Sequence, residues 1–123
     1  MHELFPATLA SVAAARHAVQ RYVAGLDVDV DGIMLAVTEA VANVVAHAYL
    51  DRAPGTVELS GAASPLEVTV VVRDHGRGLG DTGAGGGAGL GLPIIRRVAQ
   101  RVELADGRDG VVLTMSFPRG SVA

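Results

Sequence analysis

The stretch Glu39-Ala-Val-Ala-Asn43-Val-Val-Ala-His47 places three polar side chains on one side of a helix that is otherwise apolar. At about 100° per residue, the apolar side chains around this stretch gather within an arc of about 100°, the width of a normal core-facing stripe. Glu39, Asn43 and His47 lie opposite that stripe, which consists of Met34, Val37, Val41, Val44, Val45 and Ala48. The rest of their face carries no Lys, Arg or Gln, so we expect it to lie close to another group; it consists of Ala36, Ala40 and Ala46.

The polar face admits more than one chemistry. A carboxylate and a carboxamide one turn apart could hold a hydrated hard cation, because Mg²⁺ prefers oxygen ligands and keeps several waters. The Glu39 carboxylate could instead act as a general base. An ordinary solvated face is the alternative for Glu39 and Asn43, and a structural role is the alternative for His47, since helix histidines are often satisfied by packing and one hydrogen bond.

Length and composition narrow the class of protein. A chain of 123 residues is expected to form one domain, residues 1–123. The absence of cysteine excludes disulfides, thiolate metal sites and thiol nucleophiles. A net charge of −3 with scattered arginines argues against a direct nucleic-acid partner. No apolar run approaches the ~20 residues of a membrane span, and no signal-peptide pattern opens the chain, so a cytoplasmic location is expected.

The order of predicted elements indicates an α+β fold. After a short lead-in, a helix begins at Thr8 and ends before Gly25, and a second, capped by Asp27, Asp29 or Asp31, runs to about residue 50. Strands follow at 56–60 and 66–73. A third helix is expected to begin near residues 89–93 and to carry Ile94, Ile95, Val98 and Val102. Two last strands, 102–104 and 111–117, are joined by Asp106-Gly-Arg-Asp-Gly110, a hairpin signal. We predict a two-layer sandwich of a mixed, mainly antiparallel sheet with three helices on one face.

The end of the second strand combines an acid with a glycine-rich segment. Asp74 continues the inward parity of Val68, Val70 and Val72, so its carboxylate points toward the core and needs a donor. Nine of the sixteen glycines lie between Gly76 and Gly91, where backbone must bend sharply or touch a ligand. We interpret residues 79–88 as a mobile flap, and the start of the third helix as an anion site.

Three motifs stand in order along the chain: Glu39-x-x-x-Asn43, Asp74-x-Gly76-x-Gly78 and Gly87-x-Gly89-x-Gly91. Together they resemble the N, G1 and G2 boxes of the GHKL ATP-binding superfamily (HATPase_c), which includes gyrase B, the heat-shock chaperone ATPases, MutL and the histidine kinases. The run Glu-Ala-x-x-Asn-x-x-x-His-Ala-Tyr at 39–49 is most similar to the anti-sigma-factor serine kinases. The resemblance covers nearly the whole chain, from the first helix to Phe117, and the motifs are specific in combination.

The resemblance implies roles for these residues with ATP and Mg²⁺ as cofactors. Asn43 would coordinate the Mg²⁺ that bridges the phosphates, and Asp74 would accept from the adenine amino group. Glu39 would be the catalytic base that deprotonates a partner's serine while the flap orders over the γ-phosphate. Backbone would approach the nucleotide at Gly76, Gly78, Gly87, Gly89, Leu90 and Gly91.

The implied partners are an anti-anti-sigma protein of the STAS type, which would be the kinase substrate, and a sigma factor, which would be sequestered. A homodimer is a further family expectation. One departure from the family concerns the flap, which has no Arg or Lys. Any cation on the γ-phosphate must therefore come from Arg77, Arg96, Arg97 or a partner.

Three other interpretations compete. A non-catalytic module could hold ATP or ADP as a regulatory switch. A detached histidine-kinase catalytic domain is less favoured, because no phosphoacceptor helix precedes the domain. A dinucleotide-binding fold would use Gly83–Ala88, which satisfies G-x-G-x-x-A, and Glu103. Against it, the preceding strand ends nine residues before that motif.

Overall fold

One five-stranded sheet forms the base of the molecule in a computed structural model, which describes residues 1–49, 53, 55–76, 92–107 and 109–120. The strands lie in the order β1-β2-β3-β5-β4, and each neighbouring pair is antiparallel. Their bounds are β1 His2–Pro6, β2 Thr56–Ala63, β3 Glu67–Asp74, β4 Arg101–Gly107 and β5 Gly110–Pro118. This antiparallel sheet excludes the dinucleotide-binding alternative, which requires parallel βαβ units.

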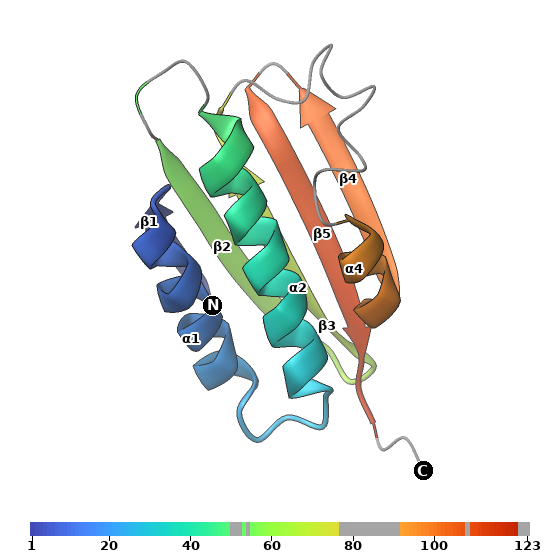
Figure 1. Cartoon of the computed structure of the whole chain (residues 1–123). Coiled ribbons are helices and arrows are strands. Elements are labelled where there is room, and N and C mark those ends of the chain that lie inside the picture. Colours follow the sequence, from blue (N-terminus) through green and yellow to red (C-terminus); the bar gives the residue numbers. More distant parts are fainter. Residues whose placement is uncertain (50–52, 54, 77–91, 108, 121–123) are drawn as a thin grey trace.

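The helices cover one face of this sheet (Figure 1). They are α1 Leu9–Val23, α2 Val30–Asn43, which continues directly as the π-helical turn η1 Val44–Ala48, and α4 Leu92–Val98. The predicted two-layer α+β class is confirmed, with antiparallel pairing throughout the described strands. Both layers meet in one core, where the inward residues of β2, β3 and β5 pack beneath α2.

The helix α2 is the middle helix of its layer and has α1 and α4 on either side (Figure 1). It therefore buries a wider surface than the predicted stripe, because its flanks are covered as well as its base. Ile33, Ala36 and Ala40 are buried together with Val37 and Val41. Two of the three alanines on the supposed polar face thus belong to the core, which corrects that part of the prediction.

The helix termini follow the sequence signals. Thr8 is the N-cap of α1, although its side chain makes no capping bond. Among the three aspartates before α2, Asp29 is the N-cap, and its carboxylate accepts the backbone N–H of Gly32 at 3.1 Å. Gly25 follows the end of α1 with φ +84°, a backbone conformation that glycine adopts without strain.

Several predicted bounds were wrong at the sheet edges. Residues 2–6, expected to be a lead-in, form the edge strand β1, which pairs with β2 through the register Leu4↔Glu58. β2 also continues to Ala63, three residues beyond its predicted end. Val102 belongs to β4 rather than to the third helix. Leu66, predicted as the first residue of the second strand, precedes β3 and has 80% of its surface exposed.

By length and composition, the 19-residue helical run Val30–Ala48 could cross a membrane, with a mean hydropathy of 1.3. This differs from the expectation that no apolar run approaches that length. Core helices meet the same criterion, and this run is the central helix of the layer packed on the sheet (Figure 1). The finding is therefore weak evidence for a membrane span.

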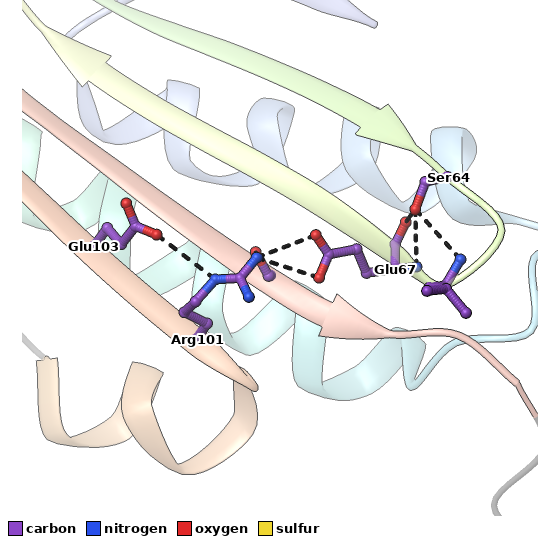
Figure 2. A network of polar contacts seen from close by, with 6 residues as sticks. Ser64, Glu67, Arg101 and Glu103 are labelled. Carbon is purple, nitrogen blue, oxygen red and sulfur yellow. Dashed lines mark hydrogen bonds and ion pairs between the residues drawn. The ribbon is translucent and has the colours of Figure 1, made fainter.

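Polar contacts tie the strands together on the sheet face opposite the helices. Figure 2 shows Arg101 on β4 reaching across β5 to Glu67 at the start of β3. Its Nη2 donates to Glu67 Oε2 at 3.2 Å, and its Nε lies 3.6 Å from Glu103 Oε1. Ser64 closes the β2–β3 turn, because its Oγ accepts the Glu67 backbone N–H at 3.2 Å.

A second set of contacts, made by Arg119 just after β5, reaches the α1–α2 connection. Arg119 Nε donates to Asp27 Oδ1 at 2.8 Å, and Arg119 Nη1 donates to the Ser64 carbonyl at 2.9 Å. The hydrogen bond from Arg119 lowers the pKa of the Asp27 carboxyl below its ordinary value.

Candidate functional site

Asp74 is the last residue of β3, and its side chain points into the molecule as predicted, with 5% of its surface exposed. Its Oδ1 accepts the backbone N–H of Gly76 at 2.9 Å and the backbone N–H of Val111 at 3.2 Å. The donors that a buried carboxylate requires are therefore main-chain amides, one from its own turn and one from β5.

Two glycines allow the backbone to close around this acid. A Cβ on Gly76 would overlap the carbonyl oxygen of Ala48, at the end of η1. A Cβ on Gly110 would overlap the Asp74 carbonyl oxygen, and Gly110 also has φ +124°. A side chain at either position would push apart the segments that hold Asp74. Gly76 was predicted from the sequence as a site residue, whereas Gly110 was seen only as part of a hairpin.

The other predicted site residues lie on the last turns of α2. Glu39 and Asn43 are half-buried, and His47 is exposed within η1. π-helical turns occur often at functional sites, and this one begins directly after Asn43. Since Gly76 contacts Ala48, the end of the helix that carries Asn43 meets the turn that follows Asp74. The structure thus brings the N-box and the Asp74 motif to the same end of the fold (Figure 1).

Tyr49 joins three segments at this end of the fold. Its hydroxyl donates to the Thr56 carbonyl at 2.6 Å and accepts the backbone N–H of His75 at 3.0 Å. Its ring lies against Gly55, where a Cβ would overlap the aromatic carbons. Sequence reasoning gave Tyr49 no physical role, because its partners lie 7 and 26 residues away along the chain.

A charged cluster borders the Asp74 turn on its exposed side. Glu58 on β2 lies 2.5 Å from His2 Nε2 and 3.5 Å from His75 Nε2. These contacts, chiefly the hydrogen bond from His2, lower the pKa of the Glu58 carboxyl. His75 is exposed.

The remaining predicted residues lie outside the described part of the chain: Gly78, Gly87, Gly89, Leu90, Gly91, the flap 79–88 and Arg77. Among the cations proposed for the phosphates, Arg96 and Arg97 are exposed in the last turn of α4.

The described residues hold no cluster of three or more His, Cys, Asp or Glu that could bind a metal ion. A single amide ligand such as Asn43 suits Mg²⁺ that is held chiefly by phosphate oxygens and water. The buried, amide-held carboxylate of Asp74 likewise suits an adenine amino group. The residues present therefore fit Mg·ATP better than a metal bound by protein ligands alone.

The model for the histidine kinase-like ATPase domain matches residues 5–117. The chain belongs to this family. The GHKL resemblance of the three motifs is thereby confirmed, and a match of this extent also covers Tyr49 and the Gly110 hairpin.

Curated relatives include anti-sigma F factors and a histidine kinase. The anti-sigma F factor of Clostridium botulinum (strain Eklund 17B / Type B) is 36% identical over 70 residues, 54% of this chain and 49% of that protein. The anti-sigma F factor of Anoxybacillus flavithermus is 35% identical over 82 residues, 64% of this chain and 56% of that protein. The chain thus spans about half the length of the curated relatives it matches. Blue-light-activated histidine kinase 2 of Erythrobacter litoralis is 33% identical over 92 residues, 70% of this chain and 27% of that protein.

Solved structures show the same fold. The histidine kinase domain of the Erythrobacter litoralis EL346 blue-light activated histidine kinase is 29% identical, with a TM-score of 0.64 over 73% of this chain and 44% of that one. The structure of the RsbU and RsbW domains of a Mycobacterium tuberculosis protein has a TM-score of 0.76 over 98% of this chain and 33% of that one. Because this second structure is only 20% identical in sequence, its similarity supports the fold alone.

Proposed function

We propose that this chain binds Mg·ATP and is a regulatory serine kinase of the anti-sigma-factor type. Its substrate would be a serine of an anti-anti-sigma protein of the STAS type, and it would sequester a sigma factor. The observation that carries the proposal is the buried Asp74 carboxylate, held by two main-chain amides beside the end of the helix that bears Glu39 and Asn43. The similarity to anti-sigma F factors also supports this proposal.

Asp74 would read the adenine base. Both amide bonds that the described residues give this side chain end on Oδ1 and hold that oxygen in place. We therefore assign Oδ2 to the adenine amino group, which is a donor. A guanine presents a carbonyl oxygen at the corresponding position, and a buried carboxylate facing that oxygen would be unfavourable.

Asn43 and Glu39 would serve the phosphate end of the nucleotide. The Asn43 side-chain oxygen would bind Mg²⁺, which offsets the charge of the phosphates. Glu39, one helical turn earlier, would take the proton of the partner's serine hydroxyl. The serine oxygen would then bond to the γ-phosphorus while the bond to the bridging oxygen breaks, leaving ADP and a phosphoserine. Arg96, Arg97 or a partner's arginine would supply positive charge.

A non-catalytic nucleotide switch is the second candidate, and one sequence feature favours it. Residues 79–88 carry no Arg or Lys, so the segment expected to close over the γ-phosphate brings no cation of its own. In this alternative, the domain would bind ATP or ADP and a regulator without phosphate transfer. For both candidate functions, we propose that the protein is cytoplasmic, consists of a single domain and forms homodimers.

Transfer of labelled phosphate distinguishes the two. The protein would be incubated with Mg·ATP and a STAS-type partner, alongside the same partner with its acceptor serine changed to alanine. The kinase proposal expects label on the serine-bearing partner only, with transfer lost in Glu39→Ala and retained in Glu3→Ala, a control on the exposed edge strand β1. Transfer that survives Glu39→Ala would remove the base assignment, and tight binding without transfer would favour the switch.

A further inference from the structure

We propose that Tyr49 is a positioning residue of the nucleotide site, which holds the turn after Asp74 in the conformation that presents the acid to adenine. The inference rests on the proposed function and extends it to a residue that contacts neither base nor phosphate. The hydroxyl group makes the decisive contacts. It bonds both to Thr56 on β2, the strand that pairs with β3, and to His75 in the turn that follows Asp74.

The two bonds of the hydroxyl have complementary directions. The O–H donates to the Thr56 carbonyl at 2.6 Å, which leaves the oxygen lone pairs to accept the His75 backbone N–H at 3.0 Å. Bonds arranged in such a chain polarise and strengthen one another. Thr56 is the first residue of β2, whose register places Val57 opposite Asp74. Tyr49 therefore connects two adjacent strand ends that both border the acid.

Consecutive amides of the turn are thereby fixed by different groups. The N–H of His75 is held by Tyr49, and the next N–H, that of Gly76, is held by Asp74 Oδ1 at 2.9 Å. The second amide is one of two that hold Oδ1, together with that of Val111, and the first amide belongs to the neighbouring peptide group of the same turn. Loss of the Tyr49 bond would let this turn rotate, and the carboxylate would rotate with it.

Packing selects this position for the tyrosine. Its ring lies against Gly55, and the preceding residue, Ala48, places its carbonyl oxygen against Gly76. Ala48 is the last residue of η1, the π-helical turn that begins directly after Asn43, and Tyr49 is its C-cap. The metal ligand and the positioning tyrosine are thus connected by one five-residue turn. A displacement at Asn43 on nucleotide binding would reach the Asp74 turn through this segment.

The chain offers a matched pair for the test, since it contains two tyrosines and no tryptophan. Tyr49→Phe removes the hydroxyl and keeps the ring, and Tyr22→Phe makes the same change on α1, beside Gly61. Dissociation constants for ATP and GTP would be measured by calorimetry for both variants and the wild type, together with their urea unfolding curves. A bond worth about 1 kcal/mol predicts that Tyr49→Phe binds ATP about fivefold more weakly.

The ratio of the two constants separates positioning from general stability. We expect Tyr49→Phe to lower the preference for ATP over GTP, and Tyr22→Phe to leave it unchanged. If Tyr49→Phe leaves the preference for ATP over GTP unchanged, whether or not both bind more weakly, the inference is overturned while the proposed function stays intact. A wild type that binds neither nucleotide would remove the proposed function itself, and the inference with it.

A second measurement needs no variant. The His75 backbone N–H is bonded to the Tyr49 hydroxyl, although the residue is exposed. Its hydrogen exchange in the wild-type protein should therefore be slower than that of the same amide in an unfolded peptide of this sequence. Exchange of the His75 amide at the rate of an unprotected amide would overturn the proposed positioning role of Tyr49.

Discussion

The Asp74 carboxylate accepts the backbone N–H of Val111 from a strand that begins 36 residues after it in the chain, with an N···O distance of 3.2 Å. The acid is therefore fixed by β5 as well as by its own turn. The relationship depends on Gly110, which passes so close to the Asp74 carbonyl that no Cβ fits between them. Asp74, Gly110 and Val111 thus form one structural unit at the end of the sheet.

Replacing Asp74 by asparagine should change the choice of base. The asparagine oxygen can accept the same two amides, which places its NH₂ where Oδ2 was. Two donors then face each other when adenine is bound, and ATP should bind more weakly by roughly 1 to 3 kcal/mol. GTP, which presents an acceptor, should lose much less. Calorimetric titration of both nucleotides checks this, and equal losses would argue against adenine readout.

Gly110→Ala should destabilise the fold more than an alanine at a comparable glycine. Gly110 and Gly120 have φ of +124° and +112°, so both changes carry backbone strain of roughly 1 to 3 kcal/mol. Only a Cβ on Gly110 would also meet the Asp74 backbone, whereas nothing lies within 4 Å of a Cβ built on Gly120. We expect the free energy of unfolding to fall by at least ~1 kcal/mol more for Gly110→Ala. Equal losses in urea unfolding would contradict the close approach.

Asn43→Ala should bind ATP with little dependence on Mg²⁺. The side-chain oxygen is the proposed protein ligand, and its removal leaves the ion with phosphate and water alone. Asn43→Asp keeps an oxygen at the same position and serves as the matched control, which should retain the dependence. Titrations with and without Mg²⁺ provide the comparison. A wild-type Mg²⁺ dependence in Asn43→Ala would place the ion elsewhere.

The pair formed by Asp27 and Arg119 predicts a pH-dependent contribution to stability. Arg119 lowers the folded-state pKa of Asp27 below its ordinary value of 3.8, so the unfolded chain takes up this proton first on acidification. The stabilisation is therefore complete above the ordinary value and is lost as the pH falls through the folded-state value. Because the pair is exposed, added salt should weaken it.

A double-mutant cycle of Asp27→Asn and Arg119→Gln measures this coupling without the bond from Arg119 to the Ser64 carbonyl. Thermal unfolding at about pH 6 should show a coupling that declines as the pH falls below the ordinary value of 3.8, and that is lost once Asp27 is protonated in the folded protein. A coupling that persists in acid would mean that the charge of Asp27 is not its source.

The sequence predicted the parts of the site that depend on local periodicity. The parity of Val68, Val70 and Val72 was enough to turn Asp74 inward, and helical spacing was enough to put Glu39 and Asn43 on neighbouring turns. Hairpin glycines likewise located the β4–β5 connection. These features are set within a few residues, so one sequence contains them.

The parts that were missed depend on long-range packing. β1 is an edge strand with Phe5 as its only half-buried residue within His2–Pro6, so it shows almost no alternation. The donors of Asp74 and the partners of Tyr49 come from elements that meet only in the folded chain. The shift from α to π geometry after Asn43 also has no signature in the sequence Val-Val-Ala-His-Ala.

The most direct test of the account is a crystal structure with Mg²⁺ and a non-hydrolysable ATP analogue. The account predicts the adenine amino group at hydrogen-bond distance from Asp74 Oδ2, the metal on the Asn43 oxygen, and Oδ1 still bonded to the amides of Gly76 and Val111. A nucleotide bound elsewhere, or one whose base makes no contact with Asp74, would contradict it.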